Sequence, residues 1–331
     1  MSFSAITGQE RAVTQLRGLL AAGRLPSALL FVGPPGVGKR MAAIELAVAA
    51  NCQNTGFDGA PCRECVSCRQ IEQGTHPDCM LLSLDTQAEF FRKAGEDESA
   101  LKKQEHIRVE PVRHMCDAAL RTAATARHKF FIIDDAETMV PSAANALLKH
   151  LEEPPPAMTW ILLSAAAESL LSTVRSRCQR VDFRPLARHD LQQILLGKSL
   201  TLAEAERLSD IADGSVEKAM RVRALLENMA EADRLSPLFP MQAAKALPKD
   251  TKEARADAAL ALELLIQNAS SRWKIETSRA KKQALAGGIK RLFEYRKYID
   301  RNVAPALALE TALLELEPLK LSFSTDSRRQ G

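Results

Sequence analysis

The residues with the clearest chemistry lie between Gly33 and Arg40, where the chain matches a phosphate-binding loop at every position except the last. The pattern G-x-x-x-x-G-K-[ST] needs backbone N–H groups and a lysine for the phosphates, and a hydroxyl for the accompanying Mg²⁺. Arg40 stands where the hydroxyl belongs and has no oxygen to offer a cation. The phosphate-binding part is retained in Gly33, Gly36, Val37, Gly38 and Lys39. The loop therefore predicts a site for ATP, ADP or a simple anion, and it makes Mg²⁺ doubtful.

A second chemical feature is the acid pair Asp134 and Asp135, which follows the apolar run 129–133. An apolar strand that ends in two acids is the Walker B arrangement. Its first carboxylate holds Mg²⁺, and its second position, usually Glu, polarises the attacking water. Asp135 is one methylene shorter than Glu, and a displacement of that size can disturb in-line attack. We therefore expect Asp134 to belong to the nucleotide site, and Asp135 to be a departure from the residue that usually orients the water.

Local sequence patterns predict the elements that hold these residues. The short apolar runs 28–32 and 159–164 are typical of buried parallel strands, and the second ends in a polar residue, Ser164. Helical spacing of apolar residues begins at Lys39 and again after Pro141. Strand, loop and helix in this order make the phosphate-binding motif specific, because the N-terminus of a helix also favours an anion.

Four of the seven cysteines lie close together in the chain, with the spacing C-x9-C-x2-C-x2-C. In a reducing compartment, clustered cysteines are more often metal ligands than disulfides. Four thiolates fill the tetrahedral shell of a structural Zn²⁺ and leave no position open for catalysis. The predicted ligands are Cys52, Cys62, Cys65 and Cys68. The alternative is a set of free surface thiols.

Length and composition limit the classes of protein that fit. At 331 residues the chain has room for two or three domains, and an aromatic content of 5% suits a mostly helical protein. The formal charge of +4 does not by itself indicate nucleic-acid binding. No apolar run approaches the ~18 residues of a membrane span, and residues 1–5 lack the features of a secretory signal. We therefore expect a cytoplasmic protein with no membrane partner.

Several motifs together resemble those of bacterial clamp-loader subunits of the AAA+ class. Residues 145–155 read Asn-Ala-Leu-Leu-Lys-His-Leu-Glu-Glu-Pro-Pro, and an apolar strand and Ser-Arg-Cys at 176–178 follow. The cysteine cluster, Ile-Thr-Gly-Gln-Glu at 6–10 and His-Pro-Asp at 76–78 are similar to the same family. The resemblance covers essentially the whole chain and is most specific from Gly33 to Cys178. Within the family it favours the delta-prime type of DNA polymerase III subunit.

The resemblance implies roles for three further positions. Arg177 would be the arginine finger, which in this family reaches the ATP of a neighbouring subunit. Ser164 falls at the sensor-1 position, where a hydroxyl can hydrogen-bond a phosphate or a water molecule. Glu217 falls where the motor subunits carry the sensor-2 arginine, and a carboxylate there would repel phosphates. Together with Arg40 and Asp135, Glu217 implies a degenerate site in this chain beside an intact residue that acts in trans.

The same resemblance implies the fold and its divisions. We expect an α/β AAA+ P-loop domain at 1–184, with a parallel sheet, flanking helices and an inserted zinc-binding knuckle at 51–79. A small helical lid at 185–235 and an all-helical collar, or oligomerisation, domain at 236–321 would follow. Residues 322–331 are expected to form a disordered tail.

Residues 272–301 combine many Lys and Arg side chains with four aromatic residues. This composition is consistent with a patch for the DNA backbone. The spacing of the aromatic residues favours instead an amphipathic collar helix with a solvated basic face and a buried aromatic stripe. The aromatic residues are Trp273, Phe293, Tyr295 and Tyr298.

The resemblance implies a subunit with little or no ATPase of its own that helps load a sliding clamp onto primed DNA during replication. Its partners would be gamma/tau and delta subunits in a five-subunit ring, with the sliding clamp and primer–template DNA engaged through the complex. Two alternatives stay open: a gamma/tau-like subunit that binds ATP and hydrolyses it slowly, and a free-standing, zinc-stabilised nucleic-acid adaptor. The near-neutral charge argues mildly against the adaptor.

Overall fold

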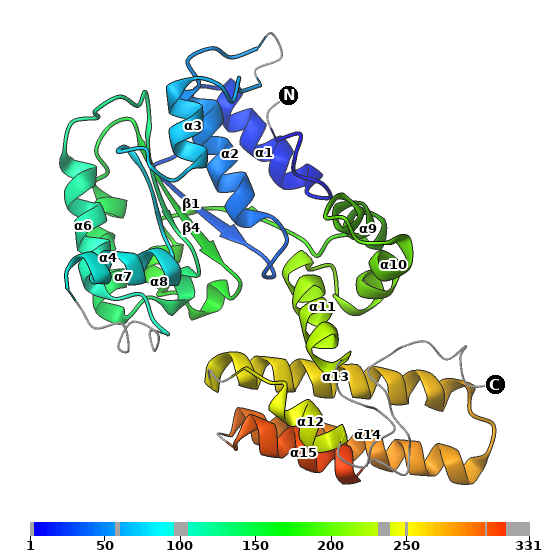
Figure 1. Ribbon diagram of the computed structural model, residues 1–331. Helices are drawn as coiled ribbons and strands as arrows, with labels where there is room; N and C mark the ends of the chain where they lie inside the picture. The colour runs from blue at the N-terminus through cyan, green and yellow to red at the C-terminus, as the bar shows by residue number, and fades with distance from the viewer. Residues whose placement is uncertain are drawn as a thin grey trace. The chain divides into compact units, whose positions relative to one another are not determined.

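The chain divides into two compact units, Met1–Ile194 and Leu195–Gly331 (Figure 1). A computed structural model describes residues 3–56, 60–95, 105–230, 239–248, 251–301 and 303–315. The tail expected at 322–331 lies outside the described residues. The division into three domains stays a prediction.

The first unit is built on a five-stranded sheet with the strand order β2-β3-β4-β1-β5. All neighbouring strands are parallel, so their carboxyl ends meet at one edge of the sheet. The central strands β1, β3 and β4 are almost fully buried, which explains their continuous apolar sequences. The strands are β1 (Ala28–Val32), β2 (Cys79–Leu82), β3 (Lys129–Ile133), β4 (Met158–Ser164) and β5 (Gln179–Asp182).

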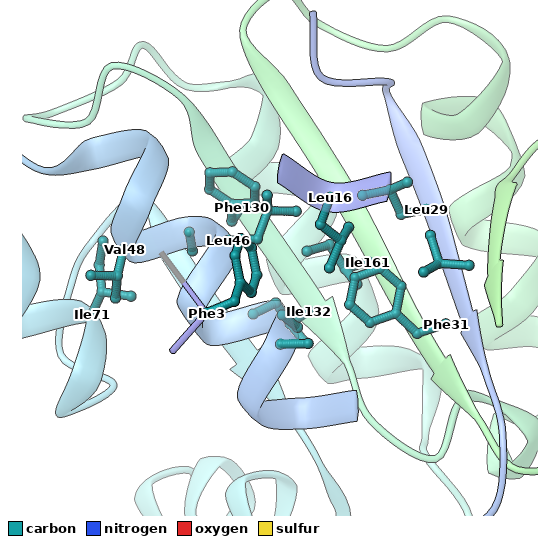
Figure 2. Packing of buried hydrophobic residues seen from close by; sticks show 14 of the residues in the cluster. Phe3, Leu16, Leu29, Phe31, Leu46, Val48, Ile71, Phe130, Ile132 and Ile161 are labelled. Atoms are coloured by element: carbon teal, nitrogen blue, oxygen red, sulfur yellow. The ribbon is translucent and has the colours of Figure 1, made fainter. Parts of the chain in front are cut away.

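Helices cover both faces of this sheet, as the expected AAA+ domain requires (Figure 1). Side chains alternate along β1, so that Leu29 and Phe31 face one apolar cluster and Leu30 faces the other. Figure 2 shows the first cluster, in which Leu46 of the second helix packs with Ile132 and other strand residues. The helices of this unit are α1 (Glu10–Ala21), α2 (Lys39–Asn51), α3 (Val66–Glu72), α4 (Leu84–Lys93), α6 (Val109–Leu120), α7 (Pro141–Glu152), α8 (Ser172–Arg175) and the start of α9 (Arg188–Gly197).

A polar brace fixes the loop that leads into β3. The carboxylate of Asp78 accepts the backbone N–H groups of Ala124, Thr125 and Ala126 at 3.0, 2.8 and 2.9 Å. Burial alone would raise the pKa of Asp78, but these hydrogen bonds outweigh it and lower the pKa. The ammonium group of Lys129, at the start of β3, donates to carbonyls at the end of α6. Asp78 of the expected His-Pro-Asp motif thus has a structural function. It helps to position β3, the strand that the acid pair follows.

The second unit consists of helices in the described residues, and α13 packs along α14. The buried stripe of α14 is aliphatic, with Leu285, Leu292 and Ile299 at intervals of seven residues. Phe293 is 52% exposed and Tyr298 45% exposed, so the prediction of a buried aromatic stripe was wrong. No helix in the described ranges is both long and apolar enough to cross a membrane. The helices are α10 (Leu202–Ile211), α11 (Val216–Ala230), α12 (Phe239–Lys245), α13 (Thr251–Ile275), α14 (Arg279–Asp300) and α15 (Pro305–Glu315).

Candidate functional site

The phosphate-binding loop connects β1 to α2 and depends on its glycines. The N–H of Gly33 donates to the carbonyl of Ser164 at 3.1 Å, which ties the loop to the end of β4. A Cβ atom on Gly33 would lie 2.3 Å from the carbonyl oxygen of Phe183, so a larger residue cannot fit without backbone movement. Gly36 and Gly38 have φ angles of 68° and 101°, which side chains disfavour. The glycines of the sequence pattern therefore stand where the backbone geometry requires them.

Lys39 places a positive charge within this loop. It is the first residue of α2, is 8% exposed, and its ammonium group donates to the carbonyls of Gly33 at 2.6 Å and Pro34 at 2.7 Å. The start of a helix of 13 residues adds a favourable potential for an anion. The buried amide of Gln9 fixes the loop from the other side, because it donates to the carbonyl of Val37 at 3.3 Å. The loop can hold an anion without any metal.

Arg40 forms an ion pair with the first acid of the Walker B arrangement. Its Nε lies 2.5 Å from Oδ2 of Asp134, the residue that follows β3. The side chain of Arg40 is 47% exposed and that of Asp134 is 15% exposed. Oδ1 of Asp134 accepts the N–H of Asp135 at 3.0 Å, so both carboxylate oxygens have partners. The guanidinium group of Arg40 thus neutralises the carboxylate of Asp134.

The remaining polar groups at this edge of the sheet follow β3 and β4. Asp135 is exposed and has a φ of 49°, an uncommon conformation for a residue with a side chain. Ser164 is fully buried, and its hydroxyl accepts the N–H of Ala166 at 3.1 Å. Glu137, which was not predicted from the sequence, also lies here. Its Oε1 accepts the N–H of Ala165 at 2.9 Å, and its Oε2 is buried without a hydrogen-bond partner among the described residues. The one sequence feature that could have indicated Glu137 is its position three residues after Asp134.

Arg177 lies at the other end of the sheet. Gln179 of β5 pairs with Leu29 of β1, whereas the phosphate-binding loop starts after Val32. Two residues before β5, Arg177 therefore starts about 10 Å or more from that loop along the strand direction. Its guanidinium group lies 2.6 Å from Oε1 of Glu152, and its side chain is 35% exposed. The structure does not bring Arg177 together with the other predicted site residues.

The second unit holds the position that the resemblance assigned to sensor 2. Glu217 is exposed in the first turn of α11. The ammonium group of the neighbouring Lys218 lies 2.6 Å from a carboxylate oxygen of Asp213 and 2.8 Å from one of Glu263. Burial opposes the charge of Lys218, but these hydrogen bonds dominate and raise its pKa. Lys218 therefore has a structural function within this unit and is not an obvious substitute for the sensor arginine.

The four predicted cysteine ligands come together at the end of α2 and the start of α3. Their sulfur atoms all lie within 4.8 Å of one another. Tetrahedral zinc–thiolate bonds of about 2.3 Å would place sulfur atoms about 3.8 Å apart, so the cluster fits a Zn²⁺ ion after a small contraction. Two backbone groups already point at sulfur: the N–H of Cys62 at Cys52 (3.2 Å) and the N–H of Cys65 at Cys62 (3.3 Å). Such donors stabilise thiolates.

Hydrogen bonding and burial shift the pKa values of the cysteines in opposite directions. Backbone donors, that of Cys65 first, lower the pKa of Cys62 to about 6. Burial raises the pKa of Cys68, the ligand inside α3, in the absence of a cation. Cys79 and Cys116 lie outside the cluster, and burial raises the pKa of each to about 12. The donor set is suited to a divalent cation, which would offset the cost of a buried thiolate.

Comparisons with known proteins identify the family. The sequence profile described as "DNA polymerase III, delta subunit" matches residues 8–187, more than half of the chain. The chain belongs to this family. It is an AAA+ protein of the DNA polymerase III clamp-loader family, as its parallel sheet and flanking helices also indicate.

Curated relatives are similar over about two thirds of the chain. It is 33% identical to "DNA polymerase III subunit tau" of Salmonella typhimurium over 225 residues, which are 66% of this chain and 32% of that protein. It is 30% identical to "DNA polymerase III subunit delta'" of Bacillus subtilis over 209 residues, 63% of this chain and 57% of the relative. The chain thus spans about a third of the length of the tau relatives that it matches.

A solved structure supports the fold. The crystal structure of a DNA polymerase III gamma subunit-related protein from Thermotoga maritima matches with a TM-score of 0.54. The match covers 94% of this chain and 99% of that one, at 18% sequence identity. At that identity the likeness shows the fold alone.

Proposed function

We propose that the chain is a delta-prime-type subunit of a bacterial DNA polymerase III clamp loader, with little or no ATPase of its own. One observation carries this proposal: Arg40 is paired with Asp134 where an ATPase of this class needs a hydroxyl and a free carboxylate. Mg²⁺ binding would require the guanidinium group to leave, and the arginine would still offer no oxygen ligand. Asp135 weakens the site further, because it is shorter than the Glu that usually orients water, and the resemblance places Glu217 at a position where an active subunit carries an arginine.

The contribution of this chain to catalysis would be Arg177, which we propose acts on ATP bound by an adjacent subunit. Its position at the opposite end of the sheet from the phosphate-binding loop supports action in trans. A guanidinium group suits the task, because it is always charged and can contact two phosphate oxygens at once. The adjacent subunit would be of the gamma/tau type, since relatives of that name share the fold-bearing part of this chain.

The wider setting follows from the same proposal. The ring would contain five subunits, including gamma/tau and delta, and would load the sliding clamp onto primer–template DNA during replication. A subunit with this role would be located in the cytoplasm. The helical second unit would supply the collar contacts between subunits.

ATP hydrolysis by the purified chain tests the proposal. We expect a rate at least about 100-fold below that of the complex assembled with gamma/tau and delta subunits, because the metal ligands are incomplete. A rate for the chain alone that is comparable to that of the complex would contradict the proposal.

A second candidate function is slow hydrolysis of ATP by the chain itself. The observation in its favour is that Lys39, Asp134 and Ser164 follow or adjoin the carboxyl ends of neighbouring strands, as in a working site. Strong Mg²⁺-dependent nucleotide binding by the unmodified chain, together with measurable turnover, would favour this candidate over the first.

We also propose that Cys52, Cys62, Cys65 and Cys68 bind one structural Zn²⁺. The convergence of their sulfur atoms and the backbone N–H groups directed at two of them support this assignment. When bound, the ion would hold the knuckle at 51–79 together and leave no coordination position for a substrate.

A further inference from the structure

The guanidinium group of Arg177 is held at two points by its own chain. Its Nη2 lies 2.6 Å from Oε1 of Glu152, and its Nη1 donates to the carbonyl of Thr173 at 2.8 Å. Thr173 belongs to α8 and Glu152 is the last residue of α7, so the anchors come from two different elements. Because the guanidinium group is planar and rigid, two anchors fix its direction as well as its position.

Glu152 occupies a place where a carboxylate is electrostatically unfavourable. The carbonyl groups at the C-terminus of a helix carry partial negative charge, and an acid in the last turn is repelled by them. The side chain is 48% exposed, so its pair with Arg177 contributes little to folding stability. The helix dipole disfavours an acid at this position, and its direct partner is the guanidinium group of Arg177.

We propose that Glu152 is a positioning residue for Arg177. This inference rests on the proposed function, because it requires that Arg177 contacts ATP in a neighbouring subunit. An arginine that is free to move loses much rotamer freedom when it engages a phosphate. The Glu152 and Thr173 contacts use two of the five N–H donors and remove most of that freedom beforehand. The anchored guanidinium group then meets the phosphate with a smaller entropic barrier.

Neighbouring residues provide matched controls. Glu153 follows Glu152 directly and is exposed, so its substitution removes the same charge from almost the same place. Arg175 lies two residues before Arg177 and has its own partner, Glu168 of the short turn after β4. These residues separate a specific pairing from a general effect of charge on this surface.

The test measures ATP hydrolysis by the assembled complex in which only the site next to this chain is active. We expect Glu152→Ala to lower kcat about ten-fold, with KM for ATP within about two-fold, because positioning affects the transition state more than ATP binding. Glu152→Gln, which keeps an oxygen acceptor without the charge, should lower kcat about three-fold. Glu153→Ala should leave kcat unchanged. The double variant Glu152→Ala with Arg177→Ala should equal Arg177→Ala alone, since Glu152 acts only through the arginine.

Three results would overturn the inference. One is a normal kcat for Glu152→Ala in a complex whose rate still depends on Arg177. Another is a further loss when Glu152→Ala is added to Arg177→Ala, because Glu152 would then act elsewhere. Finally, a normal kcat for Arg177→Ala would overturn the proposed function and this inference with it. Gel filtration confirms in each case that the variant complex has assembled.

Discussion

At the scale of single residues, Arg40 places a guanidinium group where the phosphate-binding pattern requires a hydroxyl. Its ion pair with Asp134 places a covalently attached positive charge beside the carboxylate to which our proposal assigns Mg²⁺ in an active ATPase. The ammonium group of Lys39 donates to the loop carbonyls of Gly33 and Pro34, and we expect the loop backbone to bind an anion. We therefore expect the loop to bind a phosphate group without Mg²⁺.

The variant Arg40→Thr tests this interpretation. Threonine restores the oxygen ligand and releases Asp134, so we expect Mg²⁺ to increase ADP affinity about ten-fold or more, where the unmodified chain shows no Mg²⁺ effect. Calorimetric titration with ADP, with Mg²⁺ or with EDTA, measures the difference. Arg11→Thr in α1 removes an equal charge at an exposed site and should leave binding unchanged. A strong Mg²⁺ dependence before the substitution would contradict the account.

At the scale of elements, the knuckle at 51–79 should depend on its metal. Protein purified without chelator is expected to contain about one equivalent of zinc, and Cys62→Ser should lower both the zinc content and the resistance of the knuckle to proteolysis. Cys178→Ser, outside the cluster, serves as the control. Metal analysis by plasma mass spectrometry makes the measurement. A zinc content below about half an equivalent in the unmodified protein would exclude the site.

Elements with strong local patterns could be predicted from sequence, and contacts between distant elements could not. The strand, glycine loop and helix from Ala28 to Asn51 follow from apolar runs and glycine spacing, and the four cysteines from their short separations. The pair of Arg40 with Asp134 spans 94 residues and depends on the order of the strands. The pair of Glu152 with Arg177 depends on where two helices end. Neither the order of the strands in the sheet nor the exact ends of the helices can be predicted from the periodicity of apolar residues.

The wrong prediction for α14 has a physical reason. Leucine and isoleucine at intervals of seven residues define the face that packs in the second unit, and this face excludes Phe293 and Tyr298. The near-helical spacing of the aromatic residues suggested that they form the buried stripe, but aliphatic residues form it. Tyr295 instead donates its hydroxyl to Glu315 of α15 at 2.5 Å.

At the scale of the whole molecule, we expect three buried or half-buried histidines to make the first unit sensitive to acid. Burial lowers the pKa of His76, His128 and His150, so the folded unit resists their protonation. The unfolded chain binds these protons below about pH 6.5, and stability is therefore lost as the pH falls from 6.5 toward the lower folded-state pKa values. The loss is at most about 1.4 kcal/mol per histidine for each pH unit.

Urea unfolding at pH 7.5 and 5.5 measures this effect. Fluorescence of the buried Trp160, in a Trp273→Phe background, reports on the first unit alone. We expect a lower midpoint at pH 5.5, and His189→Gln, at an exposed site, should not change the difference. Equal midpoints at the two pH values would show that folding does not oppose protonation of these histidines.

We propose that this chain completes a neighbour's active site while its own site has lost its activity. The most direct measurement is kcat for ATP in an assembled complex whose other ATPase sites are inactivated, with Arg177→Ala in this chain and Arg175→Ala as the control. The account predicts a fall on the order of 10²–10³-fold for Arg177→Ala, with assembly retained, and little change for Arg175→Ala. An unchanged kcat for Arg177→Ala in a fully assembled complex would contradict it.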